Sequence, residues 1–188
     1  MELKSRGERD PRSDYPGHSL IVFGYGNPGR QDDGLGPAAA EAIAQLEWAG
    51  VTLQTNYQLN IEDADEAAKH DRVVFVDASA IGPEPYAVRQ AVPAVQAAFS
   101  SHVMGPEGIL AICRDYYEKA PHAIIVAIRG YDFEFGETLS PLARNNLAQA
   151  IEWVKQYIIA CMGNRVTDSY NEHLPLMGST TPYANEAR

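Results

Sequence analysis

Residues 20–50 of the chain are LIVFGYGNPGRQDDGLGPAAAEAIAQLEWAG, a short apolar run, a glycine-rich loop and an alanine-rich stretch. The apolar run at 20–27 ends in glycines, as a buried strand does where it meets a loop. Residues 32–50 have the composition of a helix, which we expect to begin at the paired aspartates and to end at Gly50. This stretch therefore predicts a strand, a loop and a helix in succession.

The rest of the chain repeats this alternation. Further strands are predicted at 51–59, 73–78, 86–92 and 122–130, and further helices at 61–70, 105–119 and 140–163. The nearly all-apolar 73–78 segment is typical of the middle of a sheet that is covered on both faces, whereas the alternating 86–92 segment is typical of an edge strand. Alternation of this kind predicts a three-layer α/β sandwich, in which a mostly parallel sheet has helices on both faces.

Length and composition favour one domain. The 188 residues are 45% hydrophobic and 21% charged, as in an ordinary globular protein. No apolar run approaches the ~20 residues that span a bilayer, and the polar N-terminus lacks the apolar middle of a signal peptide, so we expect a cytoplasmic protein. We expect a flexible N-terminal arm at 1–18, a single domain at 19–163 and a polar C-terminal tail at 164–188.

The net charge argues against several kinds of binding partner, and the cysteine content argues against several kinds of structural site. The net charge of −10 argues against nucleic acid and against an anionic membrane surface as partners, because both would repel the chain. A basic or metal-bearing partner remains compatible, and we expect a monomer. Cys113 and Cys161 lie far apart without CxxC spacing, so neither a disulfide framework nor a structural zinc site is indicated. Cys113 is interpreted as a small buried hydrophobe.

Three polar residues stand where ligands usually bind in such sheets, beyond the carboxyl ends of strands. Asp33 follows the first strand, Asp77 ends the third, and His102 lies in a loop punctuated by glycine and proline. Each has a purely structural alternative. Asp32 and Asp33 could both cap the next helix, an interpretation that we favour for Asp32 and leave open for Asp33. Asp77 could form a turn, and a loop histidine is often only solvated.

Taken together, two carboxylates and one imidazole form a ligand set with open positions. Oxygen and imidazole ligands suit a divalent first-row ion such as Ni²⁺, Zn²⁺ or Mn²⁺, and three ligands leave room for a substrate group. The glycines after the first strand also allow a nucleotide-binding loop. However, GxGxxG is a weak signal, and two carboxylates at the helix start would repel a pyrophosphate.

Four segments resemble one known family, the maturation proteases of [NiFe] hydrogenases. They are GYGNPGRQDDGLG (24–36), VVFVDA (73–78), SSHVMGPEG (100–108) and IRGYDFEFGETLSP (128–141), in family order between about residues 20 and 160. The resemblance implies a twisted five-stranded sheet in a three-layer sandwich. It also implies that Asp33, Asp77 and His102 contact metal and carry catalysis, although some relatives have the longer Glu at the first position.

The implied reaction is cleavage of the C-terminal extension from a nickel-loaded large-subunit precursor, in the manner of an aspartyl-type endopeptidase. Nickel would arrive with the precursor, and another divalent ion such as zinc could occupy the site. Either a metal-bound water or a carboxylate base could start hydrolysis. Arg129, Glu134 and Glu137 could shape the cleft or be solvated loop residues. The alternatives are a non-catalytic nickel-sensing chaperone for the same precursor and a small nucleotide-binding domain.

Overall fold

The computed structural model describes residues 19–95 and 104–163. The predicted N-terminal arm, the predicted C-terminal tail and His102 lie outside these ranges. The described elements, in chain order, are β1 (Leu20–Tyr25), the 3₁₀ helix η2 (Gln31–Gly34), α1 (Leu35–Ala44), β2 (Val51–Asn56), α2 (Asp63–Ala68), β3 (Arg72–Ser79), β4 (Tyr86–Ala91), α3 (Pro106–Tyr117), β5 (His122–Arg129) and α4 (Pro141–Gly163).

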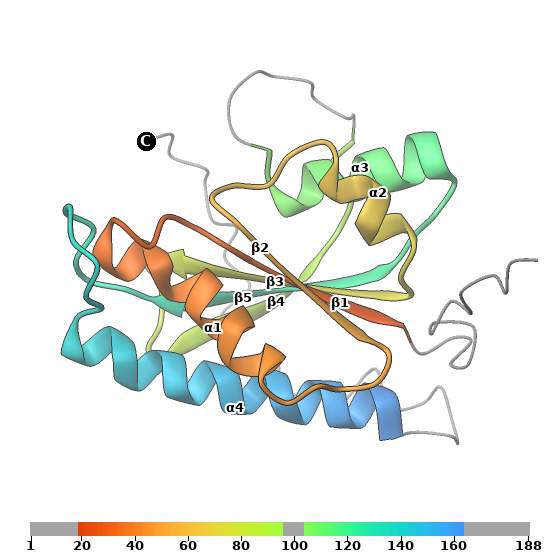
Figure 1. Cartoon of the computed structure of the whole chain (residues 1–188). Helices are drawn as coiled ribbons and strands as arrows, with labels where there is room; N and C mark the ends of the chain where they lie inside the picture. Colours follow the sequence, from red (N-terminus) through yellow and green to blue (C-terminus); the bar gives the residue numbers. More distant parts are fainter. Residues whose placement is uncertain (1–18, 96–103, 164–188) are drawn as a thin grey trace, which may run out of the picture.

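The strands form one five-stranded sheet in the order β2-β1-β3-β5-β4. All neighbouring pairs are parallel except β4 and β5, which are antiparallel. Helices α1 and α4 cover one face of the sheet, and α2 and α3 cover the other (Figure 1). The predicted three-layer sandwich is therefore confirmed, as are the central position of the 73–78 strand and the edge position of the 86–92 strand.

Alternation along each strand divides the core into two halves. Leu20, Val22 and Val74 belong to the half under α1 and α4. Phe23 and Phe75 belong to the half under α2 and α3, where their rings stack with centroids 5.6 Å apart. Because side chains two residues apart share a face, Tyr25 and Asp77 continue the Phe23 and Phe75 rows toward the carboxyl ends of the strands.

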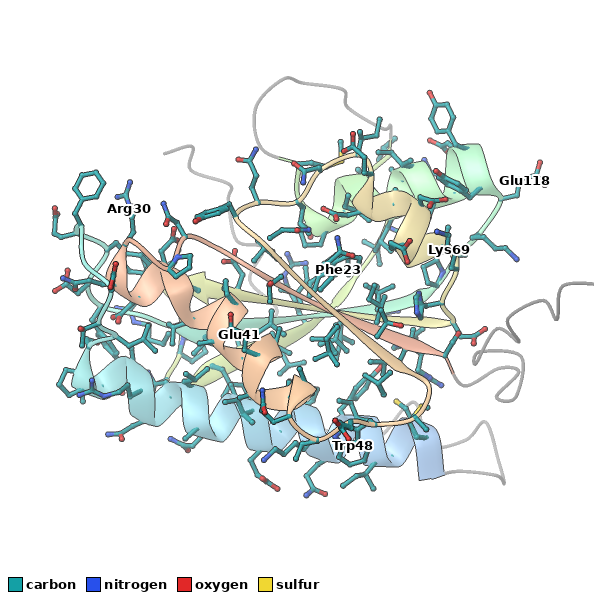
Figure 2. The ribbon with its side chains drawn as sticks, in the orientation of Figure 1. Phe23, Arg30, Glu41, Trp48, Lys69 and Glu118 are labelled. Atoms are coloured by element: carbon teal, nitrogen blue, oxygen red, sulfur yellow. The ribbon has the colours of Figure 1, made fainter. Side chains whose placement is uncertain are left out.

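The first predicted helix is shorter than expected. It starts as η2, continues as α1 and ends at Ala44, not at Gly50. After Ala44 the chain tightens, since the Leu46 and Glu47 N–H groups donate to carbonyls three residues earlier, and Glu47 then adopts a left-handed φ of 47°. Trp48, beside α4 in Figure 2, packs on the core, and this burial draws the chain away from the helical path.

Two glycines bring α1 close to the sheet. A Cβ atom added to Gly24 would lie 2.2 Å from the carbonyl oxygen of Gly36, and one added to Gly36 would lie 2.5 Å from the carbonyl oxygen of Val76. Only glycine tolerates such close backbone contact at both positions. The start of α1, and with it η2, is thereby held directly over the carboxyl ends of β1 and β3.

Candidate functional site

Asp33 lies in η2, between the end of β1 and the start of α1. Its Oδ2 accepts a hydrogen bond from the N–H of Asn27 at 3.1 Å, so the carboxylate braces its own glycine-rich loop. Residues of η2 lie within 8 Å, Cα to Cα, of residues of β3. The N-cap residues of η2 and α1 are Arg30 and Gly34, which have no side-chain cap, and Asp33 lies in the first turn of η2, so the alternative of a helix cap stays open for Asp33.

Asp32 has a structural role of another kind. Its buried carboxylate accepts hydrogen bonds from the N–H groups of Tyr131, Asp132 and Ser140 at 2.7–3.0 Å, and from the Ser140 hydroxyl at 2.8 Å. Burial raises the pKa of Asp32, but these hydrogen bonds outweigh burial and bring the pKa below its ordinary value. The predicted cap at η2 is therefore wrong for Asp32, which instead fixes the loop between β5 and α4.

Backbone contacts reinforce this junction between residues 29–32 and 131–140, which we call the loop clamp. Gln31 N–H donates to the Gly136 carbonyl at 2.7 Å, and Gly136 N–H donates to the Gly29 carbonyl at 3.0 Å. The Arg30 guanidinium donates to the Phe133 carbonyl and lies over the Phe135 ring. Figure 2 shows Arg30 at the end of the molecule where α1 and α4 begin. The loop that carries Asp33 is thus held by contacts with residues 131–140.

Asp77 lies near the end of the central strand, on the face covered by α3. It is half-buried, and its Oδ1 accepts a hydrogen bond from the N–H of Ala78 at 2.7 Å. The next strand places Ala127 directly opposite Asp77, and Ala87 on β4 lies opposite Ala127. Because these two neighbours are small, the sheet leaves open space on one side of the Asp77 carboxylate.

That space is a pocket of about 200 Å³. The start of α3 closes it opposite the sheet, with Gly105, Pro106 and Glu107 among the lining residues. Arg89 on β4 forms an ion pair with Glu107 at 2.7 Å across this wall. A volume of this size accommodates one amino-acid side chain or a few water molecules. Asp33 is not among the lining residues.

Tyr25 is a pocket residue that sequence reasoning missed. It lies beside Asp77 on the neighbouring strand, and both residues line the pocket. Burial, followed by the charges of Asp77 and Glu107, raises the pKa of Tyr25 well above its ordinary value, so the hydroxyl stays protonated and can donate to the carboxylate beside it. The alternation from Phe23 to Tyr25 could have placed the ring on this face, but its partner depends on a strand pairing that one sequence does not reveal.

The third predicted ligand, His102, lies outside the described residues. Gly105 and Pro106, which follow it closely in the chain, line the pocket beside Asp77. Within residues 19–95 and 104–163 there is no group of three His, Cys, Asp or Glu side chains that could hold a metal ion. The three-ligand set therefore stays a prediction, of which the structure places two members, Asp33 and Asp77, at the same edge of the sheet.

The other residues considered in the sequence analysis are buried in the core, hold a loop or are exposed to solvent. Cys113 and Cys161 are free thiols, and burial raises the pKa of Cys113 to about 11, in agreement with an inert core residue. The Arg129 guanidinium donates to the carbonyl of Ala80 and lies over the Tyr131 ring, so it holds the β3–β4 connection. Glu134 and Glu137 are exposed. No helix within 19–95 and 104–163 combines the length and apolar character needed to cross a bilayer.

Comparisons with known proteins give a match in fold. No family model and no curated protein sequence matches the chain. The hydrogenase maturating endopeptidase HybD from E. coli superposes with a TM-score of 0.61 at 18% identity, covering 76% of this chain and 93% of that chain. The [NiFe] hydrogenase maturation protease HycI from Thermococcus kodakarensis KOD1 gives 0.60 at 21% identity, covering 78% and 94%.

An endopeptidase from Escherichia coli, solved in solution, gives a TM-score of 0.62 at 21% identity and covers 76% of this chain and 93% of that chain. The three neighbours are therefore matched over nearly their whole length, although few residues are identical. The resemblance seen in four sequence segments is confirmed at the level of architecture. The chain has the fold of solved hydrogenase maturation endopeptidases.

Proposed function

We propose that this chain is a member of the [NiFe] hydrogenase maturation proteases and is a peptidase. Its substrate is the nickel-loaded precursor of a hydrogenase large subunit, from which it removes the C-terminal extension. Three observations support the proposal: the fold shared with solved hydrogenase maturation endopeptidases, the four sequence segments, and a carboxylate beside a pocket at the carboxyl edge of the sheet.

The observation that carries most weight is the setting of Asp77. Its carboxylate stands at the end of the central strand, accepts a hydrogen bond from the Ala78 N–H, lies beside Tyr25, and borders a pocket of one side chain's volume. In open α/β sheets this is where ligands bind. A carboxylate fixed in this way can hold a cation or accept a proton from a water molecule.

In the mechanism that we propose, Asp33, Asp77 and His102 contact the nickel ion that the precursor brings. Carboxylate oxygens and an imidazole nitrogen suit such a first-row ion, and other divalent ions, zinc among them, fit the same donors. A precursor without nickel would lack the group that these residues bind, which gives a physical basis for selecting loaded precursors. Asp33 or Asp77 then accepts the proton of the attacking water while the pocket fixes the substrate chain.

The test is a gel assay of a nickel-loaded large-subunit precursor incubated with the wild-type protein or with one of three variants. Shortening of the precursor by a small C-terminal piece is expected with the wild type, and no shortening with Asp33→Asn, Asp77→Asn or His102→Ala. The matched control is Asp115→Asn, because Asp115 is a surface carboxylate on α3 paired with Arg114. This variant should process the precursor as the wild type does.

The other outcomes identify the alternatives. Binding of the precursor without shortening, measured by co-elution on a sizing column, indicates a nickel-sensing chaperone. Nucleotide binding that survives His102→Ala indicates a nucleotide-binding domain. Full processing by a variant with all three substitutions contradicts the assignment of the site. We also propose that the protein is monomeric and cytoplasmic, which light scattering and cell fractionation test.

A further inference from the structure

The polar groups around the pocket form a row across three strands. Gly24 of β1 pairs with Val76 of β3, so the next residues, Tyr25 and Asp77, come side by side on the α3 face. Ala127 of β5 continues the row on the other side of Asp77. Asp77 thus has Tyr25 on one side and the small side chain of Ala127 on the other, and all three residues line the pocket.

Two groups lie where they can hold the Asp77 carboxylate. The Ala78 N–H donates to Oδ1 at 2.7 Å, and Tyr25 lines the same pocket from the neighbouring strand. The Tyr25 ring continues the row begun by the stacked Phe23 and Phe75 rings, which lie one pleat lower on the same face. A donor on a ring held in this way has little freedom to move away from the carboxylate.

We infer that Tyr25 is a positioning residue, whose hydroxyl orients the Asp77 carboxylate so that its remaining lone pairs face the pocket. This inference rests on the proposed function for its catalytic consequence, and it assigns a role to a residue outside the predicted set of Asp33, Asp77 and His102. Groups that hydrogen-bond a metal-binding carboxylate set its direction and its affinity, and their loss typically lowers affinity or activity by about 10–100-fold.

A purely structural role makes a different prediction. If Tyr25 served only as an apolar ring in the core, phenylalanine would replace it without loss, and only a smaller side chain would disturb the site. If the hydroxyl matters, Tyr25→Phe and Tyr25→Leu should both be impaired. Tyr86→Phe is the matched control, because Tyr86 is a buried tyrosine on the opposite face of the sheet, against Trp153.

The first measurement is steady-state processing of the nickel-loaded precursor. For Tyr25→Phe we expect kcat/KM to fall about 10–100-fold, since the hydroxyl acts on the carboxylate that contacts the nickel-loaded precursor. Tyr86→Phe should match the wild type in both constants. Wild-type kcat/KM in Tyr25→Phe, with loss only in Tyr25→Leu, overturns the inference in favour of ring packing.

The second measurement is calorimetric titration of the precursor-free proteins with Ni²⁺ alone. We expect the wild type and Tyr86→Phe to bind with equal affinity and Tyr25→Phe to bind about 10–100-fold more weakly. Equal affinity of the wild type and Tyr25→Phe, including the case in which neither binds, overturns the inference. Failure of the wild type to shorten the precursor would instead overturn the proposed function, and the Ni²⁺ titration would still decide the role of Tyr25.

Discussion

Replacement of Asp32 by alanine should unfold the loop clamp before it affects any other part of the molecule. The substitution removes one buried carboxylate and leaves four donors without their acceptor: the N–H groups of Tyr131, Asp132 and Ser140, and the Ser140 hydroxyl. Each hydrogen bond to a charged group contributes about 1.5–3 kcal/mol. The four do not add fully, because the loop can relax and water can reach part of it.

The expected loss is therefore on the order of 3–5 kcal/mol, the range found when one member of a buried ionic network is removed. For a domain of this size, roughly 2–4 °C of melting temperature correspond to each kcal/mol, so Asp32→Ala should melt roughly 6–20 °C below the wild type. Asp33→Ala removes a half-buried carboxylate that accepts a hydrogen bond from the Asn27 N–H, and the loss of that bond should cost about 1 kcal/mol.

The difference in stability between the wild type and Asp32→Ala should also depend on pH. The pKa of Asp32 in the folded state is below its ordinary value, which in an unfolded chain is about 3.9. The stabilisation by its carboxylate is therefore fully present above about pH 5 and is lost as the pH falls through the folded pKa. The gap in stability between the wild type and Asp32→Ala should narrow in acid.

Urea denaturation followed by circular dichroism, at pH 7 and again near pH 3, measures both effects. Limited proteolysis should give early cleavage within 131–140 in Asp32→Ala and not in Asp33→Ala. An Asp32→Ala protein within about 1 kcal/mol of the wild type at pH 7, or a gap that does not narrow in acid, would refute the role of the loop clamp.

Three further changes test other parts of the structure. Gly24→Ala should destabilise the fold by about 1–3 kcal/mol, because the new methyl group would lie 2.2 Å from the Gly36 carbonyl oxygen; an unchanged urea midpoint would contradict this packing. Ala127→Leu should fill the pocket beside Asp77 and slow precursor processing at least about tenfold, while the free energy of unfolding changes by less than about 1.5 kcal/mol. Processing at the wild-type rate would show that the pocket is not used. Burial raises the pKa of Cys113 to about 11, so this thiol should not react with iodoacetamide at pH 8 until urea unfolds the protein. Mass spectrometry that finds Cys113 modified in the native protein would contradict its burial.

The sequence predicted the elements of the fold better than their ends. Apolar runs and glycine punctuation identified each strand and each long helix that the structure describes in 19–95 and 104–163, because periodicity is a local property. The end of α1 was misplaced because the burial of Trp48, a tertiary contact, overrides local helix signals. The predicted start of the 140–163 helix agrees with the structure, where the hydroxyl of Ser140 accepts a hydrogen bond from the N–H of Ala143 at the start of α4.

The site was predictable to the extent that each residue follows its own strand. Asp33 and Asp77 come directly after strands, and parallel pairing brings such positions to one edge. The distinction between Asp32 and Asp33 was not predictable in detail, because the partners of Asp32 lie about a hundred residues further along the chain. Tyr25 was missed for the same reason, since its contact with Asp77 depends on the pairing of β1 with β3.

The loop clamp has a consequence for the order in which the protein becomes competent. The loop after the first strand is synthesised early in translation. Its Asp32 carboxylate can accept the hydrogen bond from the N–H of Ser140 only after 108 further residues have been added. A nascent chain that stops short of Ser140 can pair its strands but leaves the acidic loop unsupported. The ability to act on a substrate should thus arise abruptly, when the last quarter of the polypeptide leaves the ribosome, rather than by degrees.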